Sequence, residues 1–119
     1  MKENLIMRLS FKFALEIIPL YKNLIKDKEF IISKQLLRSA TSIGANVYEA
    51  SAAASRKDFI NKMTLASKEA RETYFWLKVL DEGTLVDYHL PEYLRNVKDI
   101  MNVLTAIIKT SHKNLKAKR

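Results

Sequence analysis

Apolar residues recur along most of this chain at alternating steps of three and four, the spacing that places side chains on one face of a helix. The pattern predicts helices over residues 5–26, 32–53 and 56–82, and a fourth helix that begins near residue 91. Short connections between such helices predict an all-α fold, an antiparallel up-down-up-down four-helix bundle in one domain spanning residues 1–119. The apolar rows of helices two to four are, in order, Leu36, Ala40, Ile43, Val47, Ala50 and Ala54; Phe59, Met63, Ala66, Ala70, Thr73, Leu77 and Leu80; and Leu94, Val97, Met101, Leu104 and Ile108.

The first helix carries more apolar surface than one bundle seam needs, because it has two rows. The third helix also carries more apolar surface than one core needs, because the consecutive aromatics Tyr74, Phe75 and Trp76 cannot all face one core. At least one of them is expected to face a partner subunit, where aromatic side chains are favoured; the alternative is a single exposed aromatic. The two rows of the first helix are Leu9, Phe13, Ile17, Leu20 and Leu24, and Phe11, Ala14, Ile18, Tyr21 and Ile25.

Local signals mark the helix ends. Ser55 and Asp58 have the spacing of an N-terminal cap, in which the serine hydroxyl accepts from a first-turn amide. Gly83 suits a left-handed C-terminal cap, and Pro91 suits the first turn of a helix. Pro19 lies inside the first pattern and predicts a bend or local break there.

The second helix is rich in small residues, and Gly44 lies in its middle. A glycine there costs about 1 kcal/mol of helix stability relative to alanine. We interpret it as a place where another backbone approaches closely. The sequence therefore predicts that Gly44→Leu disrupts packing or assembly far more than Ala45→Leu does.

Composition narrows the choice of fold and location. The chain has only two glycines and two prolines, which favours long helices over a sheet with many turns. It has no cysteine, which excludes disulfides and thiolate metal sites and is compatible with a reducing compartment. No apolar run approaches the roughly 18 residues of a membrane span, and charges interrupt the N-terminal residues too often for a signal peptide. We expect a cytoplasmic protein without membrane contact.

Residues that could carry catalysis are scarce. A di-iron site in a four-helix bundle needs glutamates on two helices and Glu-x-x-His on the other two. The histidines here are His89, in a loop, and His112, near the C-terminus, and neither completes that motif. Glycine-rich phosphate loops and cysteine nucleophiles are also missing from the sequence. We expect no catalytic residues, no metal and no cofactor, and thus a non-enzymatic protein.

A polar row follows one face of the second helix, and two glutamates on the third helix could lie opposite it. The favoured interpretation is a partly buried hydrogen-bonded network that fixes the helix register. The alternative is a small-ligand site in the core. The row is Arg38, Ser42, Asn46 and Glu49, and the facing glutamates are Glu69 and Glu72.

The formal net charge of +8 is concentrated in a basic C-terminal tail, residues 109–119, which contains no acidic residue. One interpretation is a solvated helix end that aids solubility; the other is a surface that attracts phosphates. Under the second interpretation, the candidate nucleic-acid-binding residues are Arg38, Arg56, Lys57, Lys109, Lys113, Lys116, Lys118 and Arg119.

Three segments of the chain, QLLRSATSIGANVYEA, SRKDF and LASKEARETYFWL, resemble the family of four helix bundle proteins. Members of that family include proteins encoded by intervening sequences within bacterial 23S rRNA genes. The most specific part is Arg-Ser-x-x-Ser-Ile-x-x-Asn, which begins here at Arg38. Many members continue with Glu-Gly-x-x-Arg, where this chain has Glu49-Ala50 and a run of alanines.

The resemblance implies a bundle that assembles into a ring-like homopentamer. A related branch, the accessory variability determinant of diversity-generating retroelements, is a basic pentamer that binds nucleic acid and a reverse transcriptase. The first hypothesis is therefore an oligomeric protein that binds RNA or DNA, structured RNA above all, with a reverse transcriptase as a possible protein partner. The second is an adaptor that docks an acidic protein and does not contact nucleic acid.

Overall fold

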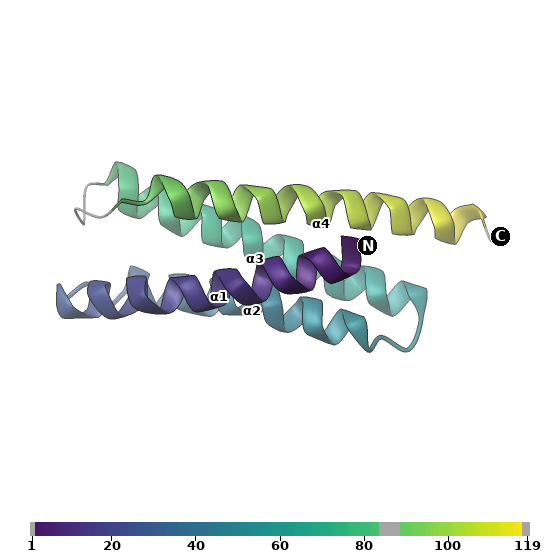
Figure 1. Ribbon diagram of the computed structural model, residues 1–119, viewed down its shortest axis with the longest axis horizontal. Helices are drawn as coiled ribbons and strands as arrows, with labels where there is room; N and C mark the ends of the chain where they lie inside the picture. The colour runs from purple at the N-terminus through teal and green to yellow at the C-terminus, as the bar shows by residue number, and fades with distance from the viewer. Residues whose placement is uncertain (1, 84–88, 118–119) are drawn as a thin grey trace.

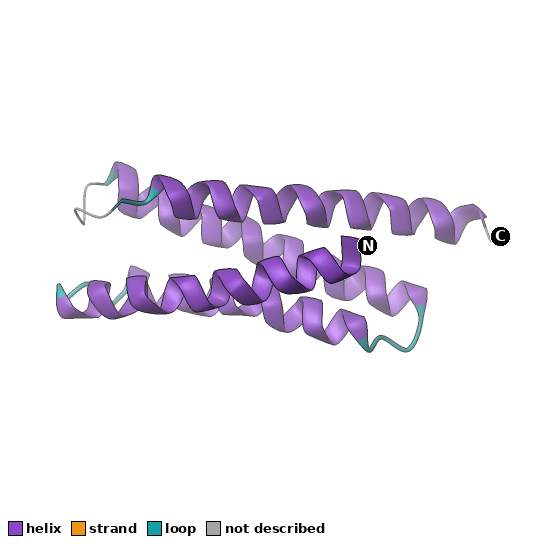
Figure 2. Cartoon of the chain, in the orientation of Figure 1, coloured by secondary structure: helices purple, strands orange, loops and turns teal. Residues whose placement is uncertain are grey.

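The computed structural model of this chain describes residues 2–83 and 89–117. It contains four helices: α1 (Lys2–Lys26), α2 (Ile32–Ser51), α3 (Arg56–Glu82) and α4 (Pro91–Ala117). They form an elongated body of 54 × 22 × 21 Å, with no strand in the described part (Figures 1 and 2). Within those residues no helix is long and apolar enough to cross a membrane.

The helices pack as a bundle in which each contacts its neighbours in the chain and α1 also contacts α4. The predicted up-down-up-down four-helix bundle is confirmed. Its antiparallel course brings three segments to one end: the start of α1, the connection between α2 and α3, and the last turns of α4 (Figure 1). We call this the α2–α3 end of the bundle.

The core follows the predicted rows closely, with four differences. On α1, Leu9 is half-buried and its neighbour Ser10 is buried. Ala54 is exposed because α2 ends at Ser51, and on α3 Ile60 is buried where Phe59 was expected. On α4 the buried face is shifted around the helix. The observed row keeps the same alternating steps of three and four, so the neighbouring helices, and not the period, decide which flank of α4 is buried. The buried α4 residues are Val97, Ile100, Leu104, Ile107 and Ser111, whereas Leu94, Met101 and Ile108 are half-buried.

The predictions for the helix ends are partly confirmed. The Ser55 hydroxyl accepts from the Asp58 amide at 3.0 Å, and Pro91 is the first residue of α4. Gly83 was predicted to be left-handed, but its φ is −75°. A left-handed cap instead follows α1, at Lys28 with φ 66°. There the Glu29 amide donates to the Leu24 carbonyl at 2.8 Å, which satisfies a carbonyl at the end of α1.

Pro19 and Gly44 test the two predictions that concern the interior of the helices. α1 is continuous from Lys2 to Lys26, so Pro19 does not break it. Gly44 does face another backbone, since a Cβ placed there would lie 3.5 Å from the Ser10 carbonyl oxygen of α1. That distance is an ordinary van der Waals contact, so this approach would also accept alanine.

Candidate nucleic-acid interface

Basic side chains form one line along the outer face of α4. Five exposed residues share this face, which lies opposite the buried row of the same helix: Arg95, Lys98, Lys109, Lys113 and Lys116. The acidic residues of α4, Glu92 and Asp99, lie on its flank, about 60° and 40° around the axis from Arg95. At a rise of about 1.5 Å per residue the line is about 32 Å long. We call these five residues the α4 basic row.

The charges of the α4 basic row are not neutralised within the described part of the chain, where none of the five forms an ion pair. Lys98 lies over the ring of Tyr74, with its Nζ 5.4 Å from the ring centroid. The segment expected to be a tail continues α4 in helical form as far as Ala117. Lys109, Lys113 and Lys116 are therefore held in register, while Lys118 and Arg119 lie outside the described residues.

Two more basic residues lie at the α2–α3 end, where the α4 basic row ends. Arg56 and Lys57 begin α3 and are exposed. A hollow of about 250 Å³ lined by Arg56, Asn114, Leu115 and Ala117 places the start of α3 beside the end of α4. The Arg56 guanidinium lies 4.8 Å from the centroid of the Phe59 ring, which orients it at this surface. Arg56 therefore lies at the same end of the bundle as Lys113 and Lys116, against the side of α4 that faces away from the α4 basic row.

Arg38 does not join this surface. Its guanidinium pairs with Glu69 at 3.3 Å and also with Glu72, which accepts from the Trp76 indole N–H at 3.3 Å. Because its guanidinium is already paired with two carboxylates, Arg38 does not offer a free positive charge to an RNA phosphate.

The family model of 23S rRNA-intervening sequence proteins matches residues 2–109. The chain belongs to this family. Among solved structures, it is similar to a protein of unknown function from the S23 ribosomal protein family of Bacteroides thetaiotaomicron. The two chains are 45% identical with a TM-score of 0.88, over 92% of this chain and 99% of the other. A comparison with curated proteins gives no match.

The family assignment confirms the resemblance drawn from the sequence motifs. In this intervening-sequence family member, Arg95, Lys98 and Lys109 lie within the matched residues, and Lys113 and Lys116 lie beyond them. Sequence reasoning had missed Arg95 and Lys98. The signal was available, because both continue the α4 spacing of the predicted basic residues toward the start of the helix.

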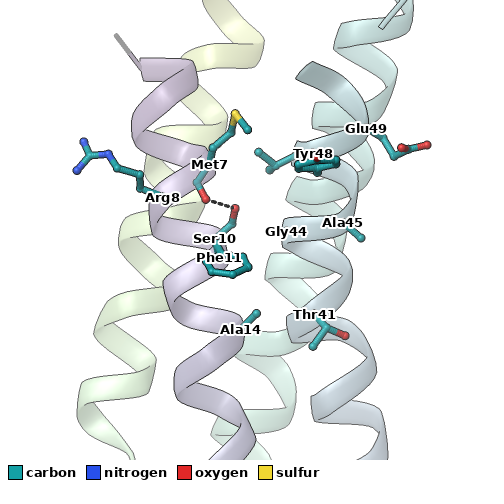
Figure 3. A pocket seen from close by; sticks show the side chains of 11 residues that line it. Met7, Arg8, Ser10, Phe11, Ala14, Thr41, Gly44, Ala45, Tyr48 and Glu49 are labelled. Atoms are coloured by element: carbon teal, nitrogen blue, oxygen red, sulfur yellow. Dashed lines mark hydrogen bonds between the residues drawn. The ribbon is translucent and has the colours of Figure 1, made fainter. Parts of the chain in front are cut away.

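The rest of the predicted polar row is divided between two places. The Asn46 side-chain amide donates to the Ser42 carbonyl at 2.9 Å within α2, and Glu49 is exposed and points away from α1 (Figure 3). Of the row, only Arg38 reaches the two glutamates of α3. The small-ligand alternative is not favoured by this geometry, since the row does not enclose one cavity.

A buried polar contact that the sequence did not predict involves Ser39, the residue after Arg38. The Thr73 hydroxyl lies 2.9 Å from the Ser39 hydroxyl oxygen and 2.8 Å from the Glu69 carbonyl oxygen. Both side chains are fully buried, so this contact joins α2 to α3 within the core. Thr73 had been assigned to the apolar row, where its hydroxyl gave no signal of a partner.

Residues suited to metal binding do not gather in the described ranges, 2–83 and 89–117. No group there brings together three histidine, aspartate or glutamate side chains in a way that could hold an ion. His89 is exposed just before α4, and His112 is exposed on α4.

Proposed function

We propose that this protein binds structured RNA through the phosphates, along the α4 basic row and the adjoining Arg56 and Lys57. The observation that carries the proposal is the row itself: five exposed basic side chains in a line of about 32 Å, with no ion pair among the described residues. Lysine and arginine that neutralise phosphates release condensed counterions, which supplies affinity without base recognition.

The shape of this surface favours a folded RNA over a specific single-stranded sequence. A straight helix face presents charges but no groove lined by stacking aromatics. Double-stranded RNA is recognised mainly by its shape and by phosphate and 2′-hydroxyl contacts. We therefore expect binding that depends on RNA structure and weakly on sequence.

We also propose that the protein acts as a homo-oligomer, with five subunits as the family resemblance implies. Each subunit would contribute one α4 basic row to a shared surface. Contacts that are weak singly would then add through effective concentration. This multiplies the affinity for any RNA long enough to touch two rows.

The test compares two variants with equal loss of charge. In the first, Lys109, Lys113 and Lys116 become glutamine; in the control, Lys22, Lys26 and Lys34, exposed at the opposite end of the bundle, become glutamine. Affinity for a fluorescently labelled RNA hairpin is measured by anisotropy over a series of salt concentrations. For the unaltered protein, log affinity should fall with log salt by about 0.7 to 0.9 per phosphate neutralised.

The α4 variant should lose about 2 to 3 units of that slope, and the control should lose about one unit or less. Equal changes in both variants would show that only net charge matters and would reject the α4 surface. If the unaltered protein does not bind RNA at low salt, the RNA proposal fails. The adaptor hypothesis, with an acidic protein on the same surface, then takes its place.

A further inference from the structure

The α4 basic row is interrupted in its middle. Arg95 and Lys98 lie near the start of α4, and we call them the first basic cluster. Lys109, Lys113 and Lys116 lie near its end, and we call them the second basic cluster. Between Lys98 and Lys109 the helix rises by about 16 Å. The outer face of α4 therefore carries positive charge at two places, with an uncharged interval between them.

Asn102 and Thr105 occupy this interval, and both are exposed. The steps from Lys98 to Asn102, Thr105 and Lys109 are four, three and four, so the two polar residues lie in the same sector of the helix as both basic clusters, about 80° wide. The Thr105 hydroxyl donates to the Met101 carbonyl at 2.8 Å, which leaves its oxygen able to accept. The Asn102 amide offers two N–H donors and one carbonyl acceptor. The interval is thus neutral but well supplied with hydrogen-bonding groups.

α4 presents this face as a flat surface. Its opposite side packs on α1 and α3, and its buried residues run from Val97 to Ser111. In Figure 1, α4 runs along one edge of the bundle for the whole length of the molecule. A helix held in this way can lie across a shallow groove, whereas a deep groove would have to admit the neighbouring helices as well.

The order of groups along α4 matches the order of groups across the minor groove of an RNA duplex. That groove is wide and shallow, and it displays 2′-hydroxyls between the phosphates of the two strands. A straight helix laid across it brings basic side chains to both borders and neutral side chains to the floor. A 2′-hydroxyl both donates and accepts, so it can pair with the Asn102 amide and with the Thr105 hydroxyl.

A DNA duplex fits the same face less well. Its minor groove is about 6 Å wide, much less than the interval of about 16 Å between the basic clusters, and it has no 2′-hydroxyl. Its major groove is about 8.5 Å deep. Side chains as short as Asn102 and Thr105 do not reach the base edges from a helix that lies across the rim of such a groove. The arrangement therefore favours RNA.

We propose that α4 lies across the minor groove of double-stranded RNA, with one basic cluster on the phosphates of each strand and with Asn102 and Thr105 on the 2′-hydroxyls between them. This inference rests on the proposed RNA binding, and it names the form of RNA, the groove and two residues that recognise it. The basic clusters supply affinity that falls with salt. Asn102 and Thr105 supply the distinction between RNA and DNA.

The experiment removes the hydrogen-bonding groups and leaves every charge in place. Asn102→Ala combined with Thr105→Val is compared with Asn61→Ala combined with Thr64→Val, on α3. The control pair is closely matched, because both residues are exposed and three positions apart, and the Thr64 hydroxyl donates to the carbonyl four residues earlier at 2.7 Å. Circular dichroism checks that both variants keep their helix content.

Each protein is titrated by anisotropy with three labelled duplexes of one sequence: RNA, 2′-O-methyl RNA and DNA. The 2′-O-methyl duplex keeps the A-form shape, but its 2′-oxygen has no hydrogen to donate and carries a methyl group in the minor groove. This duplex therefore separates recognition of the hydroxyl from recognition of the helix shape.

The unaltered protein and the control should bind the RNA duplex about tenfold more tightly than either other duplex, a factor that two net hydrogen bonds can supply. The Asn102 and Thr105 variant should bind all three duplexes about equally, with an unchanged salt slope because no phosphate contact is lost. A variant that keeps the preference for RNA, or an unaltered protein without that preference, would overturn this inference while phosphate binding by the α4 basic row stands. An unaltered protein that does not bind the RNA duplex at low salt would reject both.

Discussion

Replacing Gly44 with alanine tests the packing of α1 on α2 directly. The added Cβ would lie 3.5 Å from the Ser10 carbonyl oxygen, 3.6 Å from its carbon and 3.8 Å from the Ser10 Cβ. All three distances are ordinary contacts, so no overlap opposes the gain in helix propensity. That gain is about 0.5 to 1 kcal/mol for glycine to alanine inside a helix. For a domain of this size it corresponds to a melting temperature higher by about 2 to 4 °C.

The measurement must separate folding from assembly, because oligomerisation raises apparent stability by mass action. We would therefore compare urea unfolding of Gly44→Ala and of the unaltered protein at several protein concentrations, by far-UV circular dichroism. Ala45→Gly at the exposed neighbouring position is the matched reverse change and should destabilise by a similar amount. A Gly44→Ala protein no more stable than its parent would refute the reasoning, since the two helices would then be too close for a methyl group.

Two further predictions concern a helix cap and a tyrosine. Ser55→Ala removes the acceptor for the Asp58 amide and should lower the free energy of unfolding, measured with urea, by about 1 kcal/mol. Ser51→Ala, at an exposed site, is the control. Equal losses of stability in the two variants would contradict the role of Ser55 as a cap. Burial first, then the nearby Glu16 and Glu92, raises the pKa of Tyr93 above its ordinary value of 10.0. As the pH rises, Tyr93 therefore ionises first in the unfolded chain, so the free energy of unfolding should fall above about pH 10. In urea titrations at increasing pH, the free energy of unfolding of Tyr93→Phe should fall less steeply than that of the unaltered protein. If the free energy of unfolding of the two proteins fell equally with pH, the assignment of this effect to Tyr93 would be wrong.

The amino-acid sequence determined the number of helices, most of their boundaries and the bundle topology. These features depend on local interactions: the apolar period, the Ser55 cap and Pro91 at the start of α4 act within a turn or two of the chain. The left-handed cap at Lys28 was missed because a lysine gives no local signal for that conformation. The family motif was legible for the same reason, since it lies within two adjacent helices.

Only the tertiary structure decided how each helix is rotated and what its polar residues meet. Ile60 replaces Phe59 in the core because neighbouring helices, rather than the period alone, select the buried flank. Arg38 meets Glu69 and Glu72 across 31 and 34 residues of chain, a pairing that depends on the relative height of α2 and α3. The sequence contains both sets of residues, but their relative position follows from how the helices pack.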